Sequence, residues 1–217
     1  MGAPLVVLVP GLGLDARAWS RVLPYLPTAS TVVTLPAMGR PASAGADLRA
    51  RGQAQALARE LPPGAAIVLV GHSASCQVVV ELATHDPRIR ALVLVGPTTD
   101  PAAATWPRIL GRWLRTARHE KPWEIPVLAP QYRRTGLVSL LRGMDRLRRH
   151  RLDRALAEAS VPVVVVRGEH DHIASASWCE ALARLSGGSV TTGAGAGHMV
   201  PLTHPHLVAD AVRSVLG

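Results

Sequence analysis

The sequence of 217 residues contains no phenylalanine, no asparagine, one lysine and only two cysteines. The cysteines, Cys76 and Cys179, lie far apart, and neither belongs to a Cys-x-x-Cys pair. The sequence therefore predicts neither a disulfide framework nor a metal site. Because both cysteines occur in apolar stretches with a helical pattern, we expect them to be buried thiols.

Long apolar runs are absent as well. No run reaches the roughly 18–20 residues that cross a bilayer as a helix. The first eleven residues, MGAPLVVLVPG, carry no basic segment, and their apolar run is too short for a secretory signal. We therefore expect a cytoplasmic protein. Hydrophobic residues make up 48% of the chain, which favours one globular domain, with or without a small insertion, over disorder.

Acidic residues are outnumbered by basic ones. The chain has 24 lysines and arginines against 15 aspartates and glutamates, a formal net charge of +9. Residues 99–160 hold 13 of the basic and 6 of the acidic residues, and the remainder holds 11 and 9. A basic excess can indicate nucleic acid as a partner. Charge is the only feature that points there, so we expect no specific nucleic-acid binding.

The chain alternates between two kinds of segment. Short runs rich in valine and leucine predict strands at residues 5–9, 31–35, 66–70, 91–95, 161–167 and 189–192. Amphipathic stretches predict helices near residues 16–26, 46–61, 74–84 and 175–185 and after His204. Nearly continuous apolar strands are typical of a parallel sheet covered on both faces. The pattern predicts an α/β fold, a three-layer sandwich with a mainly parallel sheet of about six strands.

The connection formed by residues 99–160 is too long for one crossover helix. It contains Trp106, Trp113, Trp123 and several helical stretches. Leucines and a methionine within residues 137–147 fall on one helical face, away from the arginines. We expect residues 1–98 and 161–217 to form the core domain and residues 99–160 to form a helical cap over the carboxyl edge of the sheet.

The stretch LVGHSASCQVV, residues 69–79, places Ser73 between a predicted strand and a predicted helix. A serine on such a sharp turn adopts a strained backbone conformation and is exposed as a nucleophile. The residues two before and two after it come close together and must be small, as Gly71 and Ser75 are. We interpret Ser73 as a nucleophile; the alternative is a serine that caps the following helix.

An attacking serine needs a base to accept its proton. His198 lies in the glycine-rich loop GAGAGHMVPLTHP, after the last predicted strand, and is the best-placed histidine. His204 and His206 fit surface positions at the start of a helix. We expect His72, beside the serine, to have a structural role.

The base in turn needs an acid that orients it. Asp171 follows the strand in VPVVVVRGEHDHIAS and is the expected acid, unless it only caps the next helix. Asp100, after the preceding strand, is a rival. Glu169 lies closer to the strand end and is less able to reach the histidine.

Charge that develops on a carbonyl oxygen needs hydrogen-bond donors. In the loop LVVLVPGLGLDARAW, Gly11 and Gly13 permit a tight turn with exposed amides. We expect the N–H groups of Leu12 and Ala74 to be the two donors.

These residues together resemble the α/β-hydrolase fold family over essentially the whole chain. The resemblance rests on the order Ser73, Asp171, His198 and on the motifs GHSAS, VVVRGEHD and GAGHMVPL. It implies a serine hydrolase that works through an acyl-enzyme, without a metal or an organic cofactor. It also implies that residues 99–160 correspond to the family's cap.

The chain departs from the family's pattern in three places. Pro10-Gly11 stands where members usually carry His-Gly, and Ser75 replaces the second glycine of the serine motif. The chain also begins at the strand that usually comes third, so the antiparallel N-terminal hairpin is expected to be missing.

The resemblance implies hydrolysis of a carboxylic ester, thioester or lactone. The alternative is a lyase, cyclase or acyltransferase with the same three residues, because one fold hosts many reactions; an inactive binding relative is a third interpretation. The cap's tryptophans, Leu110, Leu114, Leu128 and the 137–147 face can supply an apolar surface above Ser73, which favours a hydrophobic acyl group. The cap's basic excess indicates either a solvated arginine face or attraction to an anionic or carrier-bound substrate.

Overall fold

A computed structural model describes residues 3–217, and a six-stranded parallel sheet forms its centre. The strand order is β2-β1-β5-β6-β7-β8. The strands are β1 (Leu5–Val9), β2 (Ser30–Val32), β5 (Ile67–His72), β6 (Ile89–Val95), β7 (Val163–Gly168) and β8 (Ser189–Gly193). Two short strands, β3 (Leu35–Pro36) and β4 (Gly39–Arg40), form a separate pair. The predicted α/β fold and its six-stranded sheet are confirmed.

The four central strands, β1, β5, β6 and β7, are apolar along most of their length because both faces of the sheet are covered there. In β5, Ile67 and Leu69 pack into the hydrophobic cluster on one face, and Val68 and Val70 pack into the cluster on the other. This division follows from the alternation of side chains along a strand. The sheet is therefore the middle layer of three.

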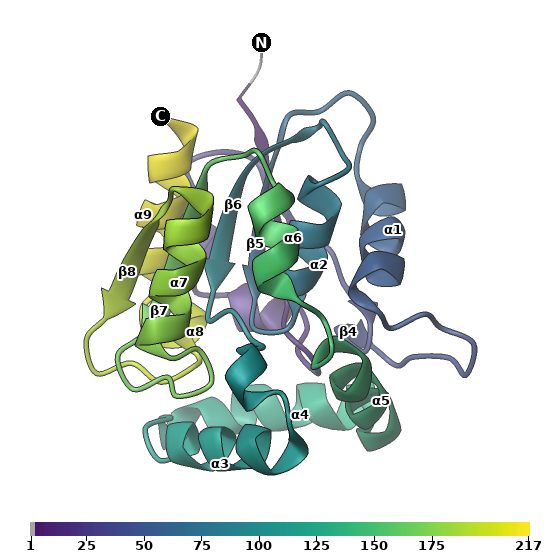
Figure 1. Ribbon diagram of the computed structural model, residues 1–217, viewed down its shortest axis with the longest axis vertical. Coiled ribbons are helices and arrows are strands. Elements are labelled where there is room, and N and C mark those ends of the chain that lie inside the picture. The colour runs from purple at the N-terminus through teal and green to yellow at the C-terminus, as the bar shows by residue number, and fades with distance from the viewer. Residues whose placement is uncertain (1–2) are drawn as a thin grey trace.

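Helices form the two outer layers (Figure 1). One face carries α1 (Ala50–Glu60), α2 (Ser75–Ala83), α6 (Leu152–Glu158) and α7 (Ala176–Ser186). The other carries α8 (Val200–Thr203), α9 (Pro205–Leu216) and the short 3₁₀ turns η1 (Ala16–Trp19) and η2 (Leu23–Tyr25). The single helix predicted over residues 16–26 is wrong: Pro24 lacks the N–H that a continuing helix needs, and two 3₁₀ turns form instead.

The connection between β6 and β7 lies beyond the carboxyl ends of the strands (Figure 1). It contains η3 (Pro101–Ala103), α3 (Trp106–Ala117), η4 (Pro122–Glu124), α4 (Ile125–Thr135) and α5 (Leu137–Leu147). The next helix, α6, instead buries Leu152 and Leu156 completely in the core cluster shared with α2 and α7. We therefore propose that the cap ends before Leu152 and that α6 belongs to the core domain.

Helix α5 packs through small residues as well as through the apolar face predicted for it. It buries Ser139, Gly143 and Leu147, whereas Leu137 is 68% exposed. A Cβ on Gly143 would lie 2.6 Å from Leu12 Cδ1, so only a glycine lets the helix come this close to the loop after β1. Leu140, Leu141 and Met144 border the cavity above Ser73 and Leu147 is buried in the core, so most of the predicted apolar face is used, whereas Leu137 lies outside it.

Both cysteines, Cys76 and Cys179, are free and buried, as predicted. Over the described residues 3–217, no helix combines the length and apolar character needed to cross a membrane.

Candidate active site

Three side chains from separate loops meet at the carboxyl edge of the sheet. Ser73 follows β5, Asp171 follows β7 and His198 follows β8. His198 Nδ1–H donates to Asp171 Oδ2 at 2.7 Å, which leaves Nε2 free to accept the Ser73 hydroxyl at 2.8 Å. The structure thus brings the three predicted residues into one hydrogen-bonded chain, through which a proton can move from serine to histidine.

The backbone at Ser73 adopts a left-handed conformation, with φ of +57°. Such a value is rare outside glycine and indicates strain that the surroundings hold in place. A Cβ on Gly71 would lie 2.8 Å from Val79 Cγ2 and 3.0 Å from the Cys76 backbone, so glycine is required there. The tight turn therefore directs the Ser73 hydroxyl away from the sheet and towards His198.

Ser75 does more than satisfy the demand for a small residue. Its side chain is buried, donates a hydrogen bond to the Val9 carbonyl at 2.7 Å and accepts one from the His72 N–H at 2.8 Å. The hydroxyl thereby joins the turn to the end of β1, a contact that glycine could not make.

Asp171 is 1% exposed, and its second carboxylate oxygen accepts the N–H groups of Ile173 and Ala174 at 2.9 and 3.0 Å. Burial alone would raise the pKa of Asp171. The charge of His198 and the hydrogen bonds from His198, Ala174 and Ile173 outweigh it and hold the pKa below its usual value. The carboxylate therefore stays ionised and fixes the tautomer of His198.

Burial and neighbouring charges also have opposing effects on the pKa of His198. Burial alone would lower the pKa of His198, but the adjacent Asp171 carboxylate and the charge of Glu120 raise it above the usual 6.5. His198 accepts a proton readily and is neutral, and so able to act as a base, above that raised pKa.

The rival acids lie elsewhere. Asp100 pairs with Arg112 at 2.7 Å, and exposed Glu169 accepts the Gly195 N–H at 2.7 Å. Neither contacts the imidazole of His198 among the hydrogen bonds of residues 3–217.

His72 is fully buried beside the site. Its Nε2–H donates to the His198 carbonyl at 3.2 Å, and its ring packs edge-on against Trp19. Burial, with the neighbouring charge of His198, lowers the pKa of His72 to about 3, so the ring stays neutral. It hydrogen-bonds to the backbone of His198 and packs against the His198 imidazole, with the ring centres 5.0 Å apart, in line with the structural role expected for it. His204 and His206 lie near the start of α9, where His206 packs against Tyr25.

The two predicted oxyanion donors come from the loop after β1 and from the residue that follows Ser73. Leu12 and Ala74 both border the cavity that contains the Ser73 side chain. Among residues 3–217, neither backbone N–H has a hydrogen-bond acceptor, whereas the neighbouring Gly13 N–H donates to the Ala37 carbonyl at 2.7 Å. Both amides are thus available to a ligand in the cavity.

Two glycines keep the loop after β1 close to the serine. A Cβ on Gly11 would lie 3.1 Å from Ser73 Cβ, and one on Gly13, whose φ is +82°, would lie 2.4 Å from the Tyr132 ring. Side chains at these positions would push the loop away from the serine or the cap away from the loop.

A cavity of about 360 Å³ separates the cap from Ser73. It is bordered by Leu12, Ser73, Ala74, Thr98, Thr99, Asp100, Ala103, Trp106, Ile109, Arg112, Trp113, Tyr132, Leu140, Leu141, Met144, Ile173 and His198. Most of these side chains are apolar, which suits a hydrophobic ligand.

Part of the apolar surface predicted for the cap lies outside this cavity. Trp123 packs against the Arg21 guanidinium, 4.3 Å from its ring centre, and Leu128 packs near Leu14 and Met199. Leu110 and Leu114 are about half exposed and do not border the cavity. Hydrophobicity alone did not distinguish side chains that face the cavity from those that face away from it.

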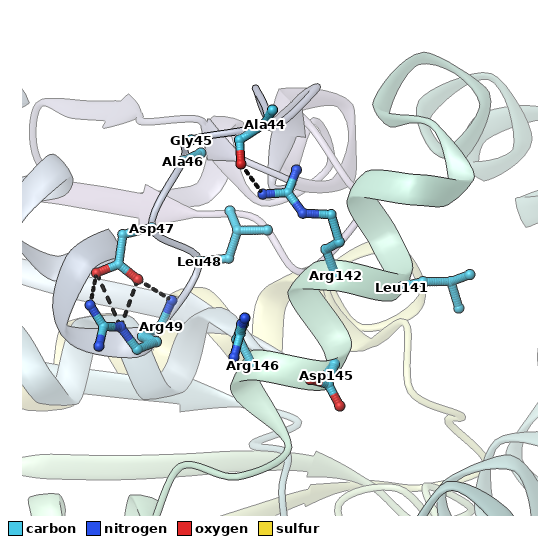
Figure 2. A pocket seen from close by; sticks show the side chains of 10 residues that line it. All are labelled: Ala44, Gly45, Ala46, Asp47, Leu48, Arg49, Leu141, Arg142, Asp145 and Arg146. Carbon is cyan, nitrogen blue, oxygen red and sulfur yellow. Dashed lines mark hydrogen bonds and ion pairs between the residues drawn. The ribbon is translucent and has the colours of Figure 1, made fainter.

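A second, basic cleft of about 610 Å³ lies between α5 and the loop of residues 44–49 (Figure 2). Arg142 donates to the carbonyls of Ser43 and Ala44, and Arg49 pairs with Asp47 at 2.7 Å. Arg146 makes no ion pair with any of residues 3–217. Leu141 borders both this cleft and the cavity above Ser73, so the two lie next to each other.

Several residues that shape the site were missed in the sequence. Arg167 is buried at the end of β7 and donates to the carbonyls of Glu169 and Ala174, which shapes the loop around Asp171. A Cβ on Gly168 would lie 2.0 Å from the Gly197 carbonyl oxygen, and one on Gly96 would lie 3.0 Å from the His198 ring. The glycine directly at each strand end was the available signal.

Within the described part of the chain, no group of three or more histidine, cysteine, aspartate or glutamate side chains could hold a metal ion.

Comparison with known proteins gives one family and many similar folds. A profile of the "Alpha/beta hydrolase family" matches residues 6–211. A pimeloyl-[acyl-carrier protein] methyl ester esterase from Aromatoleum aromaticum is 39% identical over 116 residues. That match covers 49% of this chain and 45% of the esterase, so the similarity spans less than half of the relative's length.

Solved structures extend the likeness to the whole chain. A hydrolase from Oleispira antarctica has a TM-score of 0.79 at 16% identity, covering 100% of this chain and 92% of that one. A bromoperoxidase from Bacillus anthracis has a TM-score of 0.76 at 15% identity, covering 99% and 92%. At these identities the likeness establishes the fold, and the different names of the two proteins illustrate that one fold hosts different reactions.

Proposed function

This chain belongs to the alpha/beta hydrolase family, and on that basis we propose that it cleaves a carboxylic ester, thioester or lactone through an acyl-enzyme on Ser73. The observation that carries the proposal is the continuous chain of hydrogen bonds from Ser73 through His198 to Asp171. The partial match to an ester-cleaving relative supports ester-type chemistry.

In the proposed first step, Ser73 Oγ attacks the carbonyl carbon of the substrate and its proton passes to His198 Nε2. The resulting imidazolium is stabilised by the buried Asp171 carboxylate, 2.7 Å away. The carbonyl oxygen becomes negatively charged and accepts hydrogen bonds from the Leu12 and Ala74 N–H groups. Such donors, already in place, contribute more to catalysis than groups that must reorganise.

In the steps that follow, the carbon–oxygen or carbon–sulfur bond of the tetrahedral intermediate breaks, and His198 gives its proton to the leaving alcohol or thiol. A water molecule then attacks the acyl-enzyme, with His198 again as the base. The acid leaves, and Ser73 regains its proton.

The acyl group is proposed to be hydrophobic because it must occupy a mostly apolar cavity. Each buried CH₂ group contributes about 0.8 kcal/mol, so a medium-length chain gains several kcal/mol over acetate. Measuring kcat/KM on p-nitrophenyl esters of increasing chain length tests this. A rise from acetate to medium chains supports the proposal, and no hydrolysis of any ester or thioester by a folded protein would contradict it.

The basic cleft beside the cavity supports a finer proposal, a substrate carried on an acidic partner. Arg146, which makes no ion pair with any of residues 3–217, lies where a carrier would approach if its acyl group entered past Leu141. The relative from Aromatoleum aromaticum, whose name specifies an acyl-carrier ester, supports the same class of substrate. Charge attraction of this kind accelerates association and weakens as salt rises.

Salt dependence separates a steering cleft from a merely solvated arginine face. For an acyl-carrier substrate, kcat/KM is expected to fall severalfold between low and moderate salt and to fall likewise in Arg146→Gln. Arg149→Gln is expected to have a smaller effect, because Arg149 already pairs with Asp145 at 3.2 Å. Arg151→Gln, which removes an exposed arginine paired with Asp153 away from the cleft, is the matched control. Equal salt profiles for carrier-bound and neutral esters would contradict the finer proposal.

A further inference from the structure

The cap reaches down to the loops that carry Asp171 and His198. At the end of α3, Thr116 Oγ1 accepts the N–H of His172 at 3.0 Å. Four residues later, Glu120 Oε1 accepts the N–H of His198 at 2.6 Å. One short stretch of the cap therefore contacts both the loop of the acid and the loop of the base.

Glu120 is seated directly against the backbone of the histidine loop. A Cβ on Gly197 would lie 2.7 Å from Glu120 Oε1, so only glycine leaves room for the carboxylate. Glu120 does not border the cavity above Ser73. Glu120 therefore contacts the backbone of His198 and would not touch a substrate bound in that cavity.

A second glutamate supports the first. Glu124 is 1% exposed, and its Oε1 accepts the Lys121 N–H at 3.1 Å. Among residues 3–217, Glu120 Oε2 and Glu124 Oε2 are both buried without a hydrogen-bond partner. Two carboxylate oxygens are acceptors only, but a proton on one of them supplies the missing donor.

The energetics place that proton on Glu124. Burial, then the hydrogen bond and the charge of Glu120, raise the pKa of Glu124 well above its usual range. Near neutral pH Glu124 therefore holds a proton that its Oε2 can share with the buried Oε2 of Glu120.

We propose that Glu120 is a positioning residue for His198, held in place by the buried side chain of Glu124. The inference rests on the proposed function, in which His198 is the base. The hydrogen bond to the His198 N–H fixes the backbone that carries the imidazole. The charge of Glu120 stabilises the imidazolium formed when Ser73 is deprotonated, so a residue of the cap sets the basicity of a residue of the core.

Other titratable groups also face this cluster. Asp171 and His72 approach His198 from the loops after β7 and β5, Tyr132 approaches Glu120 from α4, and Lys121 lies next to Glu124. Asp171 and Glu120 both raise the pKa of His198. Removal of the Glu120 charge alone must then lower that pKa, while Asp171 keeps the imidazole oriented.

The test uses a fluorophosphonate probe, because its reaction with Ser73 requires the base but no knowledge of the substrate. The labelling rate is measured against pH, and kcat and KM are measured on a p-nitrophenyl ester. In Glu120→Gln the amide oxygen can still accept the His198 N–H but the charge is gone. We measure both the labelling rate and kcat/KM against pH. The acid limb, the part of each profile that rises as His198 loses its proton, is expected to move to lower pH by about 0.5–1 unit. In Glu120→Ala we expect kcat to fall about tenfold or more through displacement of His198, with KM little changed.

Glu169→Gln is the matched control. Glu169 also accepts an N–H from the histidine loop, that of Gly195 at 2.7 Å, but it is exposed to solvent. Its charge is screened, so its removal is expected to leave the acid limb in place. Glu124→Gln keeps a neutral donor beside Glu120 and is expected to leave the acid limb of the pH profile in place.

The outcomes separate this inference from the proposed function. If Ser73 is never labelled in the folded wild-type protein, the proposed function fails. If Ser73 is labelled but Glu120→Gln and Glu169→Gln have the same profile as the wild type, only the positioning role fails. Glutamine has nearly the same shape as glutamate, so the pH profile of Glu120→Gln tests the positioning role even if Glu120→Ala does not fold.

Discussion

From Val70 to Cys76 every residue except Ser73 is buried, whereas α3 of the cap leaves Leu110, Trp113 and Leu114 at least half exposed. In the turn, a single hydroxyl, that of Ser75, joins β1 to the turn, and Gly71 and Gly11 allow backbones to approach closely. In the cap, apolar side chains border a cavity that is open to solvent.

The difference in packing indicates that the turn around Ser73 and the cap have different functions. A closely packed turn holds the reacting groups in fixed geometry before any ligand arrives, which favours catalysis. An incompletely covered apolar cap gains its packing only when a ligand fills the cavity, which favours selection among substrates. Substitutions in the turn should therefore lower kcat for every substrate, and substitutions in the cap should change the preference between substrates.

The largest expected effect is that of Ser73→Ala. Removal of the nucleophile leaves only binding and oxyanion stabilisation, so we expect turnover of an ester substrate to fall by at least ~10³-fold. Thermal unfolding should be nearly unchanged, since the hydroxyl makes no contact in the core. Near wild-type turnover by the folded variant would overturn the assignment of Ser73.

A loss of comparable size is expected for Asp171→Asn. An asparagine cannot stabilise the imidazolium and favours the wrong tautomer of His198, so we expect kcat to fall by ~10³-fold or more. Asp100→Asn removes the same charge from a cavity-lining residue that pairs with Arg112, and is expected to cost far less. Steady-state kinetics of both variants decide between the two acids, and a reversed ranking would move the acid to the loop after β6.

Loop shape should matter more than side-chain identity in the oxyanion loop. A β-branched residue in Gly11→Val would press against Ser73 Cβ, which lies 3.1 Å from an added Cβ. We expect kcat to fall about 10²-fold, as for loss of one oxyanion donor. Leu12→Ala keeps the backbone N–H and should retain most of kcat. Equal and mild effects of both changes would point to other donors.

The smallest expected effect, and the one specific to the cap, is that of Trp113→Ala. Trp113 borders the cavity, so its loss should lower kcat/KM for a long-chain ester about tenfold and hardly change it for an acetate ester. Leu110→Ala on the same helix is the control, because Leu110 is 56% exposed and lies outside the cavity. If the two variants have the same chain-length profile, the cap does not select the acyl group through this cavity.

Much of the fold follows from local pattern, and the misses have physical causes. The buried strands β1, β5, β6 and β7 appear as apolar runs because both faces are covered. The edge strand β2 spans Ser30–Val32 and not residues 31–35, since its half-exposed residues give a weaker pattern. In the cap, an amphipathic helix can turn its apolar face to the core, to a cavity or to solvent, and sequence does not distinguish these.

The position of the candidate site could also be predicted in part from the sequence. Parallel strands end at one edge, so Ser73, Asp171 and His198, each placed after a strand, could be expected to meet there, and the structure brings them together. Their catalytic roles stay predictions. Glu120 could not be found from sequence, because its contact with the His198 N–H depends on how the cap docks. From the sequence, Ser75 is only a small residue in place of glycine, because its hydrogen bonds to Val9 and His72 depend on the fold.

The central claim is that Ser73 is an activated nucleophile, and covalent labelling tests it most directly. With a fluorophosphonate, Ser73 Oγ would bond to phosphorus, fluoride would leave, and the proton would pass to His198. Mass spectrometry of the intact protein and of its peptides should find one adduct, located on Ser73, with a labelling rate that rises as His198 loses its proton. The adduct should be absent in Ser73→Ala. An adduct that persists in that variant, or a folded wild-type protein that never reacts, would contradict the account.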